Sequence, residues 1–447
     1  PVVPTNFYEN RSNLLHNEEV SAGTGLEGIK PTQYASTIEV EYGAAIKGVE
    51  NLGGGEHYNK ATSHFVAKRS QWILVGTVVK PFVNGNSGAV RNIKSGDYFL
   101  NYEPNVYMHE AIVNDMGQAT WDKAFADLEK EVSPSQVFAI NIPDEYGNGR
   151  ISSRYYYNTT LFPLRNGDVN DGTQAKPFSF TGRFANDAAM PSFSIENDKP
   201  RMMNNSYPSN VSAKKVEDIG KKGTVSYYDY EAGSFRPLGN DDVMLKPQHG
   251  FVFTPKATDT FTITKEMLAD GNGNTRSRSA EQPKPSFAIG LYNAGNNTNM
   301  SEIIVRYDAE HTNGVEHIMD SKKVYSPIAE TPELYMLMYD AEYARLHTAK
   351  AEQTIPLGIM LKQDMSVKFA VLNNNQYSKV MLLDKKTGKE YNLLHSSYTT
   401  EPLATDTIEG RFYLNLSVEG EYDSEVNIGG DKLTTSVEDT TQDAASI

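Results

Sequence analysis

The chain contains no cysteine, which excludes disulfides, thiolate metal sites and cysteine nucleophiles. No apolar run approaches the roughly 18 residues of a membrane-spanning helix, so we do not expect the protein to span a membrane. The sequence also lacks a Gly-x-Ser-x-Gly elbow and a His-Glu-x-x-His metal helix. Basic charge is scarce as well. The net charge is −15 without a basic stripe, and such a chain should repel nucleic acid.

Tyrosine and glycine, by contrast, are frequent, with 26 and 34 of the 447 residues. Long helix-forming runs are few, so the composition favours an all-β fold with many turns. The densest apolar run, Ser70–Val79, holds one of only 2 tryptophans and is flanked by charged residues and a proline. This run predicts a buried strand, with Trp72 as an anchor of the core.

Short alternating runs recur between turn signals along most of the chain, and they predict tandem domains of the β-sandwich or jelly-roll type. The predicted segments are a short β-rich N-terminal segment at 1–66 that forms a solenoid or a sheet edge, a β-sandwich-like domain at 67–269, a linker at 270–285, a C-terminal β-sandwich at 286–420, and an acidic, Thr/Ser-rich linker at 421–447. The boundary at 270–285 follows from its glycine, asparagine, serine and proline content and its lack of apolar periodicity.

One short amphipathic helix is expected near 120–132. Thr120 would cap this helix, an apolar stripe begins at Trp121, and Pro134 ends the pattern. The lysine pair at 214–215 is interpreted as part of a solvated turn.

Five short segments, spread in order over roughly residues 35–420, carry a resemblance to a known class of proteins. They are Trp72–Gly76, Asn205–Ser209, Pro247–Phe253, Pro332–Tyr335 and Ile355–Gly358. Together they resemble a recurring region of Bacteroidota surface proteins exported by the type IX secretion system. The resemblance implies an extracellular, cell-surface location with attachment at the outer membrane. Proteins of this class carry a C-terminal sorting domain that is removed on attachment. This sequence departs from that pattern by ending at Ile447 without such a domain, which cleavage or a further tail would explain.

Candidate binding and modification sites are few. The oxygen-rich turn around Asp168, Asn170 and Asp171 is the best candidate for calcium, because calcium prefers carboxylate and amide oxygens. Thr407 and Thr440 each follow an aspartate in a short pattern associated with O-glycosylation in Bacteroidota. The sequence indicates no other cofactor and no catalytic residue.

These observations predict a non-enzymatic, secreted surface protein with a structural or adhesive role, in a surface layer or another extracellular assembly. Its expected partners are copies of itself or other cell-surface proteins, with glycans as a further class. A sheet edge at Ile38–Tyr42 would favour such contacts. Two alternatives stay open. A carbohydrate-binding accessory module would show a surface row of tyrosines beside a pocket, and a surface hydrolase would show carboxylates converging in a cleft.

Overall fold

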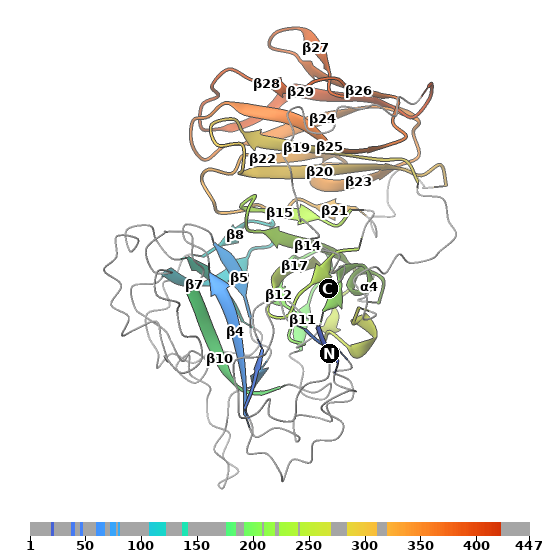
Figure 1. Ribbon diagram of the computed structural model, residues 1–447. Helices are drawn as coiled ribbons and strands as arrows, with labels where there is room; N and C mark the ends of the chain where they lie inside the picture. The colour runs from blue at the N-terminus through green and yellow to red at the C-terminus, as the bar shows by residue number, and fades with distance from the viewer. Residues whose placement is uncertain are drawn as a thin grey trace, which may run out of the picture.

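The computed structural model describes residues 19–21, 37–40, 45–47, 60–67, 72–76, 79–80, 107–121, 136–141, 176–184, 192–207, 210–219, 223–239, 242–269, 284–310 and 320–421. These residues lie mostly in strands, so the expected all-β fold is confirmed. Figure 1 shows a barrel-like unit at the top and a group of smaller sheets beneath it.

The barrel-like unit is one continuous sheet of 11 strands. Its strands are β19 (Ser286–Asn293), β20 (Met300–Tyr307), β21 (Ser321–Lys322), β22 (Glu333–Met338), β23 (Ala341–Thr348), β24 (Glu352–Met360), β25 (Val367–Asn375), β26 (Lys379–Asp384), β27 (Lys389–Asn392), β28 (Tyr398–Thr399) and β29 (Thr407–Ser417). They pair in the order β27-β26-β29-β24-β22-β23-β20-β19-β25-β28, and β21 pairs with β23. A β-sandwich at 286–420 would have two packed sheets. The strands of this region instead belong to one sheet.

The sheet closes around one apolar core. Alternate side chains along its strands point inward, as in β29, where Phe412, Leu414 and Leu416 are buried while Tyr413 and Asn415 between them are half-buried. The two end strands of the sheet approach each other, because Tyr391 of β27 stacks on Tyr398 of β28 with ring centroids 4.0 Å apart. This stack lies at the seam where the sheet meets itself.

Beneath the barrel-like unit lies a pair of four-stranded sheets that we call the two-sheet body. One sheet has the order β5-β9-β7-β8 and the other β12-β17-β14-β15. Their strands are β5 (Ile73–Val75), β7 (Tyr107–Val113), β8 (Ala119–Thr120), β9 (Val137–Asn141), β12 (Arg201–Asn204), β14 (Thr224–Asp229), β15 (Ser234–Pro237) and β17 (Gly250–Thr254). A small core draws on both sheets, including Leu74, Val137, Tyr228 and Val252, and it also includes Val324 of the barrel-like unit.

Trp72 occupies the margin of this core. Strand β5 is fully buried, as the apolar run predicted, but Trp72 itself is only partly buried. Its ring lies 6.0 Å from Trp121 in a tilted arrangement and meets His109 edge-on at 5.2 Å. Trp72 therefore packs beside the core and does not anchor its centre, contrary to the prediction.

The remaining described elements lie outside these three sheets. They are β1 (Glu19–Ser21), β2 (Thr37–Val40), β3 (Ala45–Lys47), β4 (Lys60–Ala67), β6 (Val79–Lys80), β10 (Lys176–Phe184), β11 (Phe193–Ile195), β13 (Val211–Ser212), α4 (Ala213–Ile219), β16 (Met244–Leu245), β18 (Asp259–Phe261) and the 3-10 turn η6 (Lys265–Met267). Strand β2 stands at the end of the sheet β2-β4-β10-β6, so the edge position expected for this segment is observed.

The helix expected near 120–132 falls almost entirely outside the described residues. Thr120 ends strand β8, where it pairs with Ile112, and residues 122–132 lie outside the described residues. The described α-helix is α4, which contains the lysines that were interpreted as a turn. Ser212 caps it by accepting a hydrogen bond from the Lys215 amide at 3.0 Å.

The segments that carry the family resemblance meet in space at two packing sites. In the two-sheet body, the Gly76 amide donates to the Gln248 carbonyl at 2.8 Å, and the Gln248 amide donates to the Asn205 carbonyl at 3.0 Å. In the barrel-like unit, Tyr335 pairs with Gly358, where a Cβ atom would lie 2.1 Å from the tyrosine ring. These motifs are therefore explained by packing, because glycine alone leaves room for the partner side chain.

Candidate binding cleft between the two units

The two-sheet body and the barrel-like unit are joined through their backbones. The Ala119 amide donates to the Tyr325 carbonyl at 2.9 Å, and the Tyr325 amide donates to the Gly117 carbonyl at 2.8 Å. Gly117 has a φ of +79°, and a Cβ atom there would lie 2.4 Å from the Lys323 carbonyl oxygen. Glycine thus permits both the turn and the close approach of the two units.

The turn between β7 and β8 holds Met116 out toward solvent. The Asn114 side-chain oxygen accepts hydrogen bonds from the amides of Met116 at 3.0 Å and Gln118 at 2.9 Å. The Asn114 side-chain amide donates to the Gln118 side chain at 3.0 Å. These bonds make a compact turn in which Met116 is 70% exposed.

A second tight turn faces it from the barrel-like unit. Tyr339 and Asp340 connect β22 to β23 with φ values of 51° and 58°. Positive φ at both central residues matches the two-residue hairpin turns whose twist suits antiparallel strands. The turn carries the Tyr339 side chain, which is 47% exposed.

Between these two turns lies a cleft of about 800 Å³, which we call the junction cleft. Apolar side chains that include Val324, Met338 and Met360 line it, and Met116 and Tyr339 also border it. Polar groups reach it from both units, with Gln118 on one side and Lys322 and Asp340 on the other. A hollow that combines apolar side chains with polar groups from both sides is a candidate binding site.

The Tyr325 hydroxyl stabilises one wall of the junction cleft by donating to Glu342 Oε2 at 2.5 Å. Burial raises the pKa of Tyr325, and the hydrogen bond to Glu342 raises it further. The phenol therefore stays protonated at neutral pH and keeps this wall in one arrangement.

Buried charges fasten the units together behind the cleft. Arg345 of β23 donates to the Leu238 carbonyl at 2.9 Å and to Glu217 of α4 at 3.2 Å. Arg236 of β15 donates to Glu302 of β20 at 2.5 Å. The body and the barrel-like unit therefore share hydrogen bonds that would be left unsatisfied if they separated.

A second hollow of about 300 Å³ adjoins the junction cleft, because Asp115 and Pro200 line both. Its walls carry Glu110, which accepts a hydrogen bond from Gln136 at 2.7 Å. Lys199 pairs with Asp115 at 3.3 Å and with Glu196 at 2.7 Å. The carboxylates here are thus held by amide and ammonium partners, and we call the two adjoining hollows together the extended groove.

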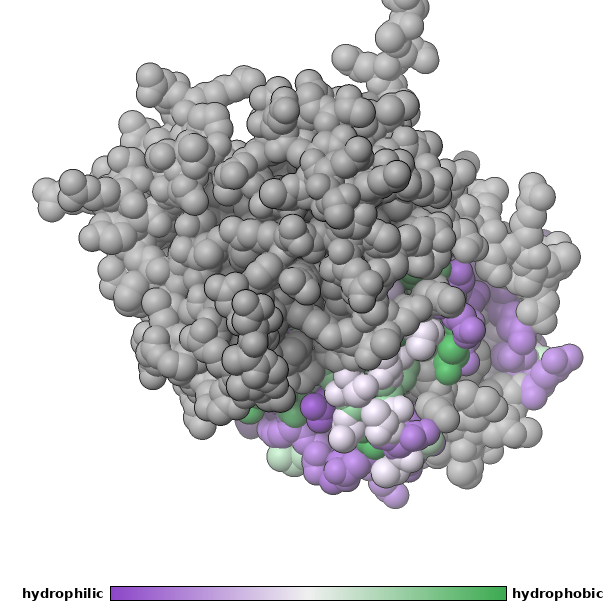
Figure 2. All heavy atoms as spheres, turned by 90° about the horizontal axis from the view of Figure 1, so that it is seen from below, coloured by the Kyte–Doolittle hydropathy of each residue, from purple (hydrophilic) through white to green (hydrophobic). Residues whose placement is uncertain are grey.

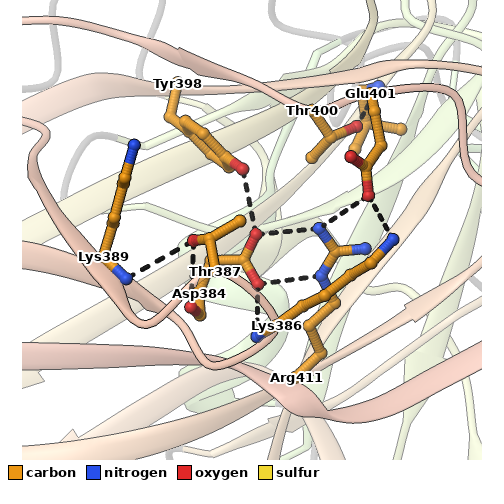
Figure 3. Close-up of polar contacts among 9 residues, drawn as sticks. Asp384, Lys386, Thr387, Lys389, Tyr398, Thr400, Glu401 and Arg411 are labelled. Carbon is orange, nitrogen blue, oxygen red and sulfur yellow. Dashed lines mark hydrogen bonds and ion pairs between the residues drawn. The ribbon is translucent and has the colours of Figure 1, made fainter.

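A separate polar network lies at the seam of the barrel-like unit (Figure 3). Asp384 is buried and accepts two hydrogen bonds from Arg411, at 2.9 and 2.8 Å, and one from the Tyr398 hydroxyl at 3.0 Å. The hydrogen bond from Arg411 lowers the pKa of Asp384. Glu401 in turn pairs with Lys386 and with Arg411. Because each of these groups has a partner in the network, we assign it to closure of the seam.

Most residues singled out from the sequence fall elsewhere. The calcium candidates Asp168, Asn170 and Asp171 lie outside the described residues, as does Thr440. Thr407 is exposed at the start of β29. Among the described residues, no group of three or more His, Asp or Glu side chains is placed to hold a metal ion, and no helix is long and apolar enough to cross a membrane.

Sequence reasoning missed the residues that border the junction cleft. Tyr339 and Asp340 contain neither the glycine nor the asparagine that usually marks a two-residue turn. Met116-Gly117 is a turn signal, but nothing in it indicates which distant segment it meets. The contact between residues 117 and 325 is a tertiary property.

From below, the described residues present hydrophobic side chains scattered among hydrophilic and intermediate ones (Figure 2).

In comparisons with known proteins, no family model, no curated protein and no solved structure matches this chain.

Proposed function

We propose that this chain is a secreted cell-surface protein with a structural or adhesive role, and that it holds its partner in the junction cleft. The observation that carries the proposal is the pair of exposed side chains, Met116 and Tyr339, held by tight turns across a cleft of about 800 Å³. Large apolar side chains that remain exposed beside a concave surface are characteristic of interaction sites.

The joint behind the cleft supports the same role. A protein that bears load between a surface and a partner benefits from a site whose two walls do not separate. Here the walls are tied by backbone pairing at Tyr325 and by the buried contacts of Arg345. The resemblance to exported Bacteroidota surface proteins supports the cellular location.

The proposal is tested by coating beads with the full chain and measuring how strongly the beads adhere to bacterial cells. We expect a Met116→Ser, Tyr339→Gly double variant to lose most of the adhesion, while Ile219→Ala, which alters an exposed apolar residue on α4, retains it. Equal adhesion of the wild type and the double variant would refute a role for the cleft.

Self-association is examined separately by sedimentation of the full chain with and without a calcium chelator. Association through a sheet edge such as β2 is expected to be independent of the double variant, because β2 does not line the cleft. A monomer in both conditions would restrict the proposed role to adhesion to other molecules.

A further inference from the structure

The conformation of Tyr339 is unusual for its residue type. Asparagine, aspartate and glycine adopt positive φ most readily, whereas a bulky aromatic residue seldom does. Tyr339 nevertheless has a φ of 51° and keeps 47% of its surface exposed at the mouth of the junction cleft. An unfavourable residue in a tight turn is a sign that its side chain serves a purpose other than stability.

The groups around Tyr339 include both hydrogen-bond donors and acceptors. Lys322 supplies an ammonium group, Asp340 a carboxylate, and Gln118 an amide whose oxygen is already engaged by Asn114. Sugar hydroxyls both donate and accept, so they match such a mixed set. The C–H groups on one face of a pyranose ring pack well against an aromatic ring.

A polypeptide strand is a poorer fit for the same hollow. Strand addition requires unpaired backbone groups at a sheet edge. The backbone along this cleft is instead used in contacts between the units, at Gly117, Ala119 and Tyr325, and in the bond from the Lys323 amide to the Glu342 carbonyl at 2.9 Å. The cleft therefore offers side chains rather than an open edge.

The adjoining hollow extends the site beyond a single ring. It begins at the shared residues Asp115 and Pro200 and carries polar groups from Glu110, Gln136 and Arg201. A ligand with repeated hydroxyl groups could follow this groove from Tyr339 toward β7.

We propose that the extended groove binds an oligosaccharide, with one sugar ring stacked on Tyr339 and its hydroxyls held by Lys322, Asp340 and Gln118. This inference rests on the proposed function, because it names the ligand class of the same cleft. Binding strengthens with the number of sugar rings until the adjoining hollow is filled.

The test is binding of the full chain to an immobilised panel of neutral, N-acetylated and uronic-acid oligosaccharides of two to six rings, followed by calorimetry with the best member. Tyr339→Phe retains the ring and should bind within about twofold of wild type. Tyr339→Gly removes the ring and should weaken binding about tenfold, which corresponds to about 1.4 kcal/mol. Ile219→Ala serves as the control on a distant exposed apolar residue.

Misfolding is separable from lost binding in this design. Glycine is favoured at positive φ, so Tyr339→Gly should leave the unfolding midpoint unchanged or raise it. An empty panel, or equal binding by wild type and Tyr339→Gly, would overturn the oligosaccharide proposal. If the cleft variants still lost cell adhesion while the panel stayed empty, the adhesive function would stand and its ligand would be another class of molecule, such as a protein.

Discussion

The barrel-like unit and the two-sheet body differ in how their cores are completed. The main core of the barrel-like unit draws only on residues of that unit, including Ile303, Leu357 and Phe412. The core of the body includes Val324, which comes from the barrel-like unit. This difference indicates that the barrel-like unit can be stable alone, whereas the body depends on its neighbour for part of its apolar burial.

The charges differ between the two regions as well. At the barrel seam, Asp384 and Arg411 bind each other within one unit. At the junction, Arg345 and Arg236 reach across to partners in the other unit. Removal of a seam charge should therefore weaken one unit, whereas removal of a junction charge should weaken the coupling between two.

The largest effects are expected from truncation of core phenylalanines. Phe412→Ala in the barrel and Phe235→Ala in the body remove fully buried rings, and each should cost about 3–5 kcal/mol. Hydrogen exchange read by mass spectrometry should show that Phe412→Ala exposes amides in both units, while Phe235→Ala exposes mainly β12, β14 and β17. Full protection of the body in Phe412→Ala would contradict its dependence on the barrel.

Loss of a junction arginine should follow in size. Arg345→Met leaves Glu217 and the Leu238 carbonyl without their partner, at a cost of about 3 kcal/mol. Calorimetry should then resolve two unfolding transitions, with the body unfolding first. Arg411→Met should lower the unfolding temperature without splitting the unfolding of the barrel-like unit and the two-sheet body into two transitions. The control is Lys386→Met, whose exposed pair with Glu401 should contribute little because solvent screens it.

The smallest effect concerns the pH dependence of the seam. Because Arg411 lowers the folded-state pKa of Asp384 below its ordinary value of 3.8, the carboxylate stabilises the fold above that pH. This contribution is lost as the pH falls from 3.8 through the lower folded-state pKa. The stability difference between wild type and Asp384→Asn should therefore shrink over that range in urea titrations. If the stability difference between wild type and Asp384→Asn did not change with pH, the charge of Asp384 would not contribute to stability.

The periodic strands of the barrel-like unit were predictable because one face of each is apolar. Strand β19 carries such a face with Phe287, Ile289 and Leu291, and β25 does so as well. Strand β23 has the polar residues Arg345 and His347 on one face, a pattern that predicts exposure. Both are nevertheless buried, Arg345 by Glu217 and the Leu238 carbonyl of the other unit and His347 by Asp320 of its own unit. A polar residue in a strand predicts an exposed face, and only the tertiary structure shows whether a partner buries it.

By itself, the sequence determined the all-β class and the recurrence of short strands between turn signals, because alternation and turn chemistry act over a few residues. Only the tertiary structure decided the single, nearly closed sheet, the junction and its cleft. These depend on contacts between segments far apart in the chain, such as Gly117 with Tyr325 and Arg345 with Glu217. Local patterns specify which face of a strand is buried, but the partner that buries it is chosen by packing of the whole chain.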